Sequence, residues 1–301
     1  MSSHSNTSPP SNESFFTRHA FLLRRLHSLT GVIPIGVFLI VHLTTNSSIL
    51  WGLIDSKKQA YGHAGVATFQ HEVNFIHSMP FLILIEIFGL WLPIAFHSIL
   101  GVYYAVSGKG NTSNYGYAAN WRYRLQRISG YVGVLFLFYH VATLRWGWTF
   151  LVPGGTEWSA KYAASTLAAA LQGSTTGMTF AGLLVSAFYM LGVSLLVFHL
   201  ANGLWTAAIT WGLTISASAQ RRWGYVCAGL GAALMAAAWS AVIGFATLDY
   251  SKARATEERL IAGHGAGTSQ PNTGGAQESL VDASGNEARS KSLNDTNSEA
   301  K

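Results

Sequence analysis

Five long apolar runs are the feature that most limits what this chain can fold into. They cover residues 27–51, 80–106, 125–150, 177–213 and 223–248. At a rise of about 1.5 Å per residue, each run is long enough to cross the roughly 30 Å hydrocarbon core of a membrane. Only 11% of the 301 residues are charged, whereas soluble domains carry about a quarter. The sequence therefore predicts an all-α integral membrane bundle of five transmembrane helices in residues 20–248.

The segments outside these runs are polar or weakly apolar. Residues 1–19 begin with a Ser- and Pro-rich stretch, and from residue 249 to 301 the chain is rich in Gly, Ser, Asn and Glu. Such segments bury too little apolar surface to offset the entropy of ordering, so both are predicted to be disordered tails. Residues 152–176 contain KYAASTLAAALQG, which is too short for a sixth span and is predicted to form an interfacial helix.

The distribution of cations predicts the orientation. Lysines and arginines concentrate in the loops on the side of the N-terminus, which the positive-inside rule assigns to the cytoplasm. These are Arg18, Arg24, Arg25, Lys109, Arg122, Arg124, Arg127, Arg221 and Arg222, against Lys57, Lys58, Arg145 and Lys161 in the outer loops. The net charge is +6, but the lysines and arginines are scattered and form no dense basic patch, so no nucleic-acid partner is expected. The single cysteine, Cys227, excludes an intrachain disulfide.

One histidine lies inside each of the first four runs. They are His42, His97, His140 and His199. Ionisable side chains are costly in a membrane and usually functional. No carboxylate or cysteine lies within a helical turn of any of them, which disfavours a di-iron centre. Haem iron takes one or two axial ligands, so four histidines on four helices predict two bis-histidine b haems.

Depth in the membrane predicts how the histidines pair. At about 1.5 Å per residue, His42 and His140 lie roughly 20 Å from the cytoplasmic ends of their helices. The second and fourth helices enter from the outer side of the membrane. His97 lies roughly 25 Å along the second helix and His199 roughly 30 Å along the fourth, so both fall in the cytoplasmic half. We therefore expect His42 with His140 at an outer haem iron and His97 with His199 at an inner one.

Four ordered blocks carry a resemblance to a known family. They are RRLHSLTGVIPIGVFLIVHL, LPIAFHSILGVYYA, LQRISGYVGVLFLFYHV and FHLANGLWTAAITWG. In order and spacing they resemble the cytochrome b membrane-anchor subunit of succinate:quinone oxidoreductases (succinate dehydrogenases and fumarate reductases), in the class with five helices and two haems. The resemblance covers roughly residues 20–246.

The resemblance implies the working parts of the chain. It implies an anchor in the bacterial cytoplasmic membrane that binds flavoprotein and iron–sulfur subunits, carries two haems and reduces quinone, usually menaquinone, near the outer haem. The dicarboxylate chemistry belongs to another subunit. The family's axial ligands fall on the four histidines above, and its haem propionate contacts fall on His27 and Ser28. Val197 stands where fumarate reductases with a compensating proton path carry glutamate, which favours a succinate dehydrogenase.

Other polar residues are weaker candidates. Glu72, His77 and Glu86, with His71, are candidates for a quinone or proton site, although surface polarity or a hydrogen-bonded acid explains them as well. Arg24, Arg25 and Arg127 suit propionates, or serve topology alone. Gly31, Gly36, Gly130, Gly133 and Gly203 suit either close helix packing or a flat ring against the backbone. Trp51, Trp121, Trp146 and Trp148 are expected at the membrane interface.

Two other functions remain open on the sequence. One is a cytochrome b subunit of a hydrogenase or formate dehydrogenase, which also uses membrane histidines. The other is a proton-coupled transporter whose histidines relay protons and which binds no haem. Reduced-minus-oxidised spectra distinguish the transporter from the haem proteins.

Overall fold

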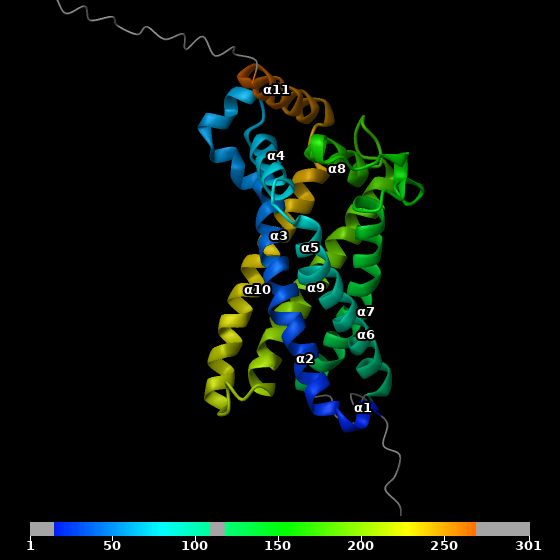
Figure 1. Cartoon of the computed structure of the whole chain (residues 1–301), viewed down its shortest axis with the longest axis vertical. Coiled ribbons are helices and arrows are strands. Elements are labelled where there is room, and N and C mark those ends of the chain that lie inside the picture. Colours follow the sequence, from blue (N-terminus) through cyan, green and yellow to red (C-terminus); the bar gives the residue numbers. More distant parts are fainter. Residues whose placement is uncertain (1–14, 109–117, 269–301) are drawn as a thin grey trace, which may run out of the picture.

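The structure is a computed structural model that describes residues 15–108 and 118–268, and in these residues it contains no β-strand. The bundle is long and narrow, with its longest helices running roughly along one axis (Figure 1). The helices are α1 (Phe15–Arg18), α2 (Ala20–Val32), α3 (Pro34–Trp51), α4 (Ala64–His77), α5 (Leu82–Glu86), α6 (Leu92–Ser107), α7 (Ala118–Leu144), α8 (Ala163–Gln172), α9 (Phe180–Thr210), α10 (Ala217–Ala246) and α11 (Tyr250–Thr268). A π-helical turn, Ile87–Trp91, joins α5 to α6.

Five segments in the described residues are long and apolar enough to cross a membrane. They are Ala20–Ile54, Leu82–Ser107, Asn120–Leu144, Phe180–Thr210 and Ala217–Ala246. The prediction of a five-helix membrane bundle is thus confirmed, with boundaries that differ by up to seven residues from those expected. Leu, Ile, Val and Phe side chains remain exposed along the spans, which suits lipid contact.

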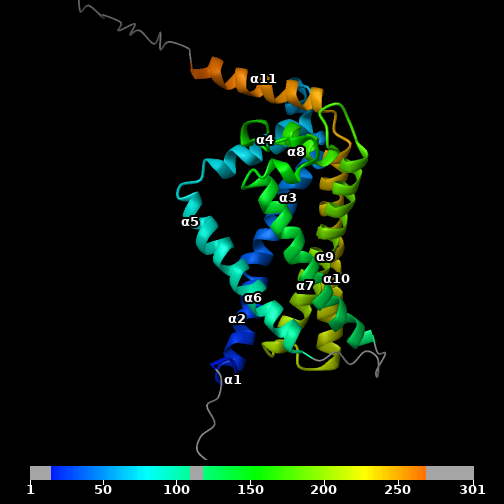
Figure 2. The ribbon, with the colours of Figure 1, turned by 90° about the vertical axis from the view of Figure 1, so that its right-hand side faces the viewer.

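The first span bends where α2 meets α3. Pro34 is the first residue of α3, and Ile33 separates the two helices. Proline has no backbone N–H and its ring clashes with the preceding turn, so it breaks a helix at the residue before it. The bend gives α2 its own direction and sets it beside α6 and α9, as Figure 2 shows for α6.

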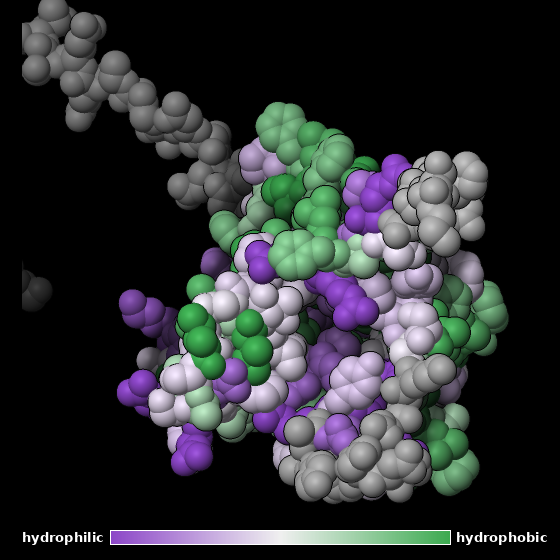
Figure 3. Space-filling view, turned by 90° about the horizontal axis from the view of Figure 1, so that it is seen from below, coloured by the Kyte–Doolittle hydropathy of each residue, from purple (hydrophilic) through white to green (hydrophobic). Residues whose placement is uncertain are grey.

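The two ends of the bundle differ in charge. The end that carries α1, which we call the basic end, holds Arg18, Arg24, Arg25, Arg122, Arg124, Arg127, Arg221 and Arg222. The carboxylates of the described residues lie towards the other end: Asp55, Glu72, Glu86, Glu157, Asp249, Glu257 and Glu258. Seen from below in Figure 3, the basic end shows hydrophilic side chains around a hollow.

The other end is closed by α4, α8 and α11, which we call the cap. Every residue of α8 is buried, so residues 163–172 form a buried helix rather than the interfacial one predicted. An Ala-rich helix has small side chains on all faces, and such a helix packs against neighbours on every side. Here α4, α9, α10 and α11 surround it.

The prediction of a disordered tail from residue 249 is wrong for the part that the structure describes. Helix α11 begins at Tyr250 and packs on α4 and α8. Its Glu257 is fully buried and accepts hydrogen bonds from the backbone N–H groups of Ala164 (2.8 Å) and Ser165 (3.1 Å) and from the Ser165 hydroxyl (2.5 Å). One carboxylate thus satisfies two of the free N–H groups at the N-terminus of α8. In the N-terminal tail, Phe15–Arg18 is helical, and residues 1–14 lie outside the described part.

Candidate functional site: two histidine pairs in the bundle

The structure brings the four intramembrane histidines together in the two pairs expected from their depth. The ring centroids of His97 and His199 are 6.1 Å apart with an interplanar angle of 83°, and we call these the inner pair. The centroids of His42 and His140 are 5.7 Å apart at 86°, and these form the outer pair. The inner pair lies towards the basic end, since α6 and α9 end there, and the outer pair lies nearer the cap.

The spacing within each pair suits a shared metal ion. A transition metal bonded to one nitrogen of each ring, at about 2 Å per bond, would hold the two imidazole centroids roughly 6 Å apart. Within the described residues, His, Cys, Asp and Glu form no group of three or more that could hold a metal. Each pair in the described residues thus offers two imidazole rings.

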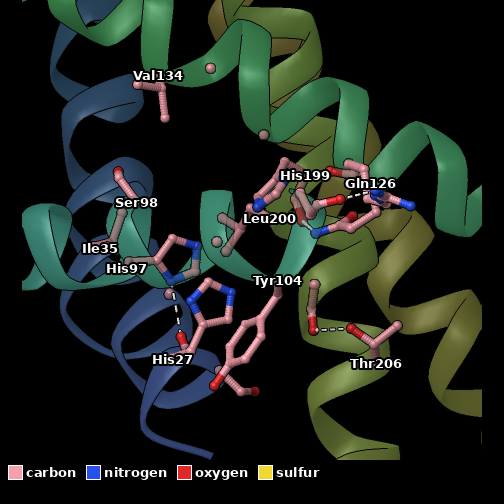
Figure 4. Close-up of a pocket in the computed structure, with 18 of the residues that line it drawn as sticks. His27, Ile35, His97, Ser98, Tyr104, Gln126, Val134, His199, Leu200 and Thr206 are labelled. Carbon is pink, nitrogen blue, oxygen red and sulfur yellow. Dashed lines mark hydrogen bonds between the residues drawn. The ribbon is translucent and has the colours of Figure 1, made fainter. Parts of the chain in front are cut away.

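A large cavity surrounds the inner pair. Its volume is about 560 Å³, within the range of sites that bind small molecules and cofactors. Both inner histidines line it, together with apolar side chains such as Ile35 and Leu196 and with the glycines Gly31, Gly36, Gly101, Gly130, Gly133 and Gly203. Figure 4 shows His97, His199 and His27 around this space.

Two of the cavity glycines lie directly against the inner histidines. A Cβ atom on Gly31 would come within 2.5 Å of His97 Cε1, and one on Gly130 within 3.2 Å of His199 Cε1. Two others face leucines instead, Gly36 against Leu200 and Gly133 against Leu196. Gly36 and Gly133 thus allow close helix packing, and Gly31 and Gly130 leave room for the inner histidines.

His27 and Tyr104 present unpaired polar atoms at the cavity. His27 stacks on His97 with centroids 4.0 Å apart and 12° between planes. Both residues line the cavity, and the His27 Nδ1 and Tyr104 hydroxyl oxygen are buried without a hydrogen-bond partner. Such groups normally find a partner, so a ligand with a polar or acidic edge fits here. Ser28 also lines the cavity.

The inner histidines have their outward nitrogens fixed. His97 Nδ1 lies 2.9 Å from the backbone oxygen of His27, and His199 Nδ1 lies 3.1 Å from the backbone oxygen of Gln126. A carbonyl oxygen only accepts, so Nδ1 carries the proton in both rings. The remaining nitrogen, Nε2, then keeps its lone pair for a metal.

The outer pair has an aromatic environment. His42 stacks on Phe38 (5.2 Å) and His140 on Phe136 (5.9 Å), while the edge of Tyr189 contacts His140. The Nδ1 of His140 is buried and has no hydrogen-bond partner. The two pairs therefore differ in how firmly their rings are held.

The candidate propionate arginines separate into two groups. Arg24 and Arg127 line the cavity rim, where Arg24 lies 5.3 Å from the Tyr104 ring centroid and Arg127 donates to the backbone oxygens of Ala105 and Gly108. Arg25 instead faces Phe21 and Trp211. The cavity thus opens among cations at the basic end.

The three quinone-site candidates each have a separate partner. Glu86, at the end of α5, forms a 2.8 Å ion pair with Arg145, just beyond α7. His71 Nδ1 lies 3.7 Å from Glu72 Oε1, and the His71 side chain is 69% exposed. His77 Nδ1 bonds the backbone oxygen of Val73 at 2.9 Å.

Beside the Glu86 pair, Trp91 and Trp146 stack 6.1 Å apart. Trp51, Trp121, Trp146 and Trp148 are exposed at span ends.

Several residues of the inner site were missed from the sequence. Gln126 and Ser129 form hydrogen bonds with the backbone or the ring of His199, and Asn202 donates to the Gln126 side chain. A signal existed, because Asn202 lies three residues after His199 and therefore on nearly the same helix face. A side-chain amide inside a membrane span, like a histidine there, is costly unless it has a hydrogen-bond partner.

One curated relative resembles most of the chain. The succinate dehydrogenase cytochrome b558 subunit of Bacillus subtilis (strain 168) is 35% identical over 206 residues, which are 68% of this chain and 87% of the relative. No protein-family model and no solved structure matches the chain. The likeness thus extends over most of the sequence and is not confined to one short motif.

Proposed function

The chain belongs to the succinate dehydrogenase cytochrome b subunit family, and we propose that it is the membrane anchor that carries two b haems and delivers electrons to a quinone. The chain is a multi-pass membrane protein and part of an enzyme complex. Its proposed partners are the flavoprotein and iron–sulfur subunits of that complex, and the dicarboxylate chemistry takes place outside this chain.

One observation carries the proposal more than any other. Two pairs of histidines, contributed by α3 with α7 and by α6 with α9, lie at two levels of one bundle with ring centroids 5.7 and 6.1 Å apart. A relay of one-electron carriers across a membrane needs two such levels. Haem iron, when bound, supplies this one-electron chemistry.

The residues of this chain bind and orient the inner group. His97 and His199 offer Nε2 as ligands because Nδ1 donates to a backbone carbonyl in each. His27, Ser28, Tyr104, Arg24 and Arg127 face the acidic edge of the group, where two propionates would meet hydrogen-bond donors and cations. Leu and Ile side chains and the cavity glycines exclude water from its faces.

The charges support an orientation for the anchor. The basic end lacks carboxylates within the described residues, so by the positive-inside rule we place it on the cytoplasmic side of a bacterial membrane. The iron–sulfur subunit would dock there, close to the inner pair. The outer pair would then serve a quinone, for which we propose menaquinone, with Glu72, His77 and Glu86 as the titratable candidates.

We infer the direction of electron flow from the residue two positions before His199. Val197, two residues before His199, is 1% exposed and packs in an apolar cluster with Leu43, Leu234 and Ala238. This buried apolar site holds no carboxylate that could carry protons across, so we propose succinate oxidation. One charge moved across 100 mV is worth about 2.3 kcal/mol, and the membrane potential would assist electrons moving outward. Succinate–quinone activity that is unchanged by complete uncoupling would contradict this direction.

Haem quantitation tests the assignment of ligands. We expect two haems per chain in the wild type. His42→Ala and His140→Ala should each lose one spectral species, and His97→Ala and His199→Ala the other. A variant that retains both haems would overturn the pairing, and a wild type without a b-haem band would return the chain to the transporter hypothesis. Co-purification with a hydrogen- or formate-oxidising metalloenzyme would favour the other cytochrome b class.

A further inference from the structure

A chain of side-chain hydrogen bonds runs from the basic end to His199. Arg122 donates two hydrogen bonds to Asn202 Oδ1, from Nε at 3.1 Å and from Nη2 at 2.8 Å. Asn202 Nδ2 donates to Gln126 Oε1 at 2.8 Å. Gln126 Nε2 in turn donates to the backbone oxygen of His199 at 3.1 Å. Three side chains from α7 and α9 thus connect a surface cation to the backbone of a proposed axial ligand.

Gln126 holds His199 from two sides. Its side chain binds the His199 carbonyl, and its backbone oxygen accepts from His199 Nδ1 at 3.1 Å. The Ser129 hydroxyl donates to that same backbone oxygen at 3.0 Å and lies 3.1 Å from His199 Nδ1. With both contacts in place, the ring of His199 is restricted in rotation and its Nδ1 proton is fixed.

Because Asn202 is buried, both of its side-chain hydrogen bonds matter for stability. Its side chain is 5% exposed, and a buried amide left without partners costs free energy. Its oxygen is satisfied by Arg122 and its nitrogen by Gln126, so Asn202 couples the two. Arg122 also lies with its guanidinium 4.0 Å from the centroid of the Trp205 ring, which fixes the guanidinium on the side of α9.

We propose that Arg122, Asn202 and Gln126 are positioning residues that orient His199 and bring one positive charge to bear on the group bound at the inner pair. The proposal rests on the function proposed above, because it requires a haem at His97 and His199. A hydrogen bond to the outward nitrogen of a ligating histidine raises the basicity of the ligand, and losing such an outer contact typically costs 10- to 100-fold in metal affinity. A nearby cation stabilises the reduced state of the bound iron, which carries one positive charge fewer.

The test uses the full chain in membranes, with redox titration and low-temperature electron paramagnetic resonance of the ferric state. Arg122→Gln should lower the midpoint potential of the inner haem and leave that of the outer haem unchanged. Arg122→Lys, which keeps the charge, should restore most of the potential. Gln126→Met should shift the resonance of the inner haem, since this signal depends on the angle between the two axial rings, and should weaken its binding about tenfold.

Arg124→Gln is the matched control. Arg124 lies two residues along the same helix, has the same charge and packs over the Trp121 ring at 5.2 Å, with no hydrogen bond to Asn202. If Arg122→Gln shifts the inner potential no more than Arg124→Gln, or if Gln126→Met leaves the inner resonance and haem affinity unchanged, the positioning role is wrong. A wild type without a second haem would instead refute the proposed function, so the two failures are distinguishable.

Discussion

The imidazole ring of His27 lies flat on the ring of His97, with 4.0 Å between centroids and 12° between planes. The backbone oxygen of His27 also accepts the hydrogen bond from His97 Nδ1. One residue of α2 therefore supports a proposed ligand of α6 through both its side chain and its backbone. The side chain has a further free nitrogen at the cavity.

Substitution of His27 should separate these contributions. His27→Ala removes the stacked ring and the free Nδ1 but keeps the backbone carbonyl, so we expect weaker inner haem binding, by about 1 kcal/mol from the lost ring pair alone. His27→Phe keeps a stacked ring and loses the nitrogen. It should recover the packing part of the loss only, as measured by haem retention during detergent titration. Equal retention in His27→Ala and the wild type would contradict the proposed support.

Gly31 gives a steric test of the inner site. A Cβ atom in Gly31→Ala would lie 2.5 Å from His97 Cε1, closer than any ordinary contact, and His97 is held by His27 and has little freedom to move. We therefore expect loss of the inner haem with the outer haem retained, measured by haem content and reduced-minus-oxidised spectra.

Gly229→Ala is the control for this substitution. No atom lies within 4 Å of a Cβ placed on Gly229, in the middle of α10. Alanine in a helix interior is more stable than glycine by roughly 0.5–1 kcal/mol, so this variant should keep both haems. Retention of both haems in Gly31→Ala would show that the glycine serves helix packing alone.

The sequence allowed the histidine pairs to be predicted because the helix rise converts residue number into depth, and four histidines in four spans leave few arrangements. The contacts around them were not predictable in the same way. Gln126 and His199 are 73 residues apart, and their hydrogen bond depends on how α7 and α9 are rotated against each other. The role of Gly31 was ambiguous for the same reason, since a glycine beside a neighbouring helix and one beside a ligand have the same sequence pattern.

Helix α11 was missed because its overall composition is polar. Its buried residues, Ala253, Thr256 and Glu257, follow a spacing of three and four residues, but two of them are polar and carry no hydrophobic signal. The stabilising partner, the N-terminus of α8, lies about ninety positions earlier. The helix therefore depends on tertiary contacts more than on its own propensity.

The Glu86–Arg145 pair joins two spans of the bundle near the proposed quinone site. The Glu86 side chain is 21% exposed and that of Arg145 is 53% exposed, so solvent screens the pair and we expect a coupling of about 1 kcal/mol or less. In a double-mutant cycle of thermal unfolding, Arg145→Gln should destabilise the chain by leaving a carboxylate unpaired. Adding Glu86→Gln should recover part of that loss.

The Asp55–Lys58 pair provides the comparison, since it is wide at 3.8 Å and lies within the short 3-10 helix Ser56–Tyr61 and its N-cap. Its cycle should give a coupling near zero. If Glu86 also supplies protons to quinone, Glu86→Gln should slow quinone reduction at unchanged haem content, by the roughly 100-fold or more typical of general acid–base groups. Unchanged rates would limit Glu86 to a structural role.

Glu257 should make the stability of the cap depend on pH. Burial raises the pKa of the Glu257 carboxyl above its usual value, and hydrogen bonds from Ser165 and Ala164 oppose this only in part. The folded cap then binds a proton more tightly than the unfolded segment does. Its stability is greatest below the ordinary carboxyl pKa and decreases as pH rises through the raised one.

Two variants and a neighbouring control test this dependence by hydrogen exchange at the N-terminus of α8, with rates corrected for intrinsic pH effects. Glu257→Gln should keep α11 docked and remove the pH dependence between mildly acidic and neutral pH. Glu257→Ala leaves the backbone N–H groups of Ala164 and Ser165 without their acceptor and should reduce protection by about 1–3 kcal/mol. Glu258→Ala removes the adjacent carboxylate, which is 60% exposed and pairs with Arg254 at 3.4 Å, so its effect should stay within about 0.5 kcal/mol. Equal protection in Glu257→Ala and Glu258→Ala would mean that the buried carboxylate does not hold α11 on the cap.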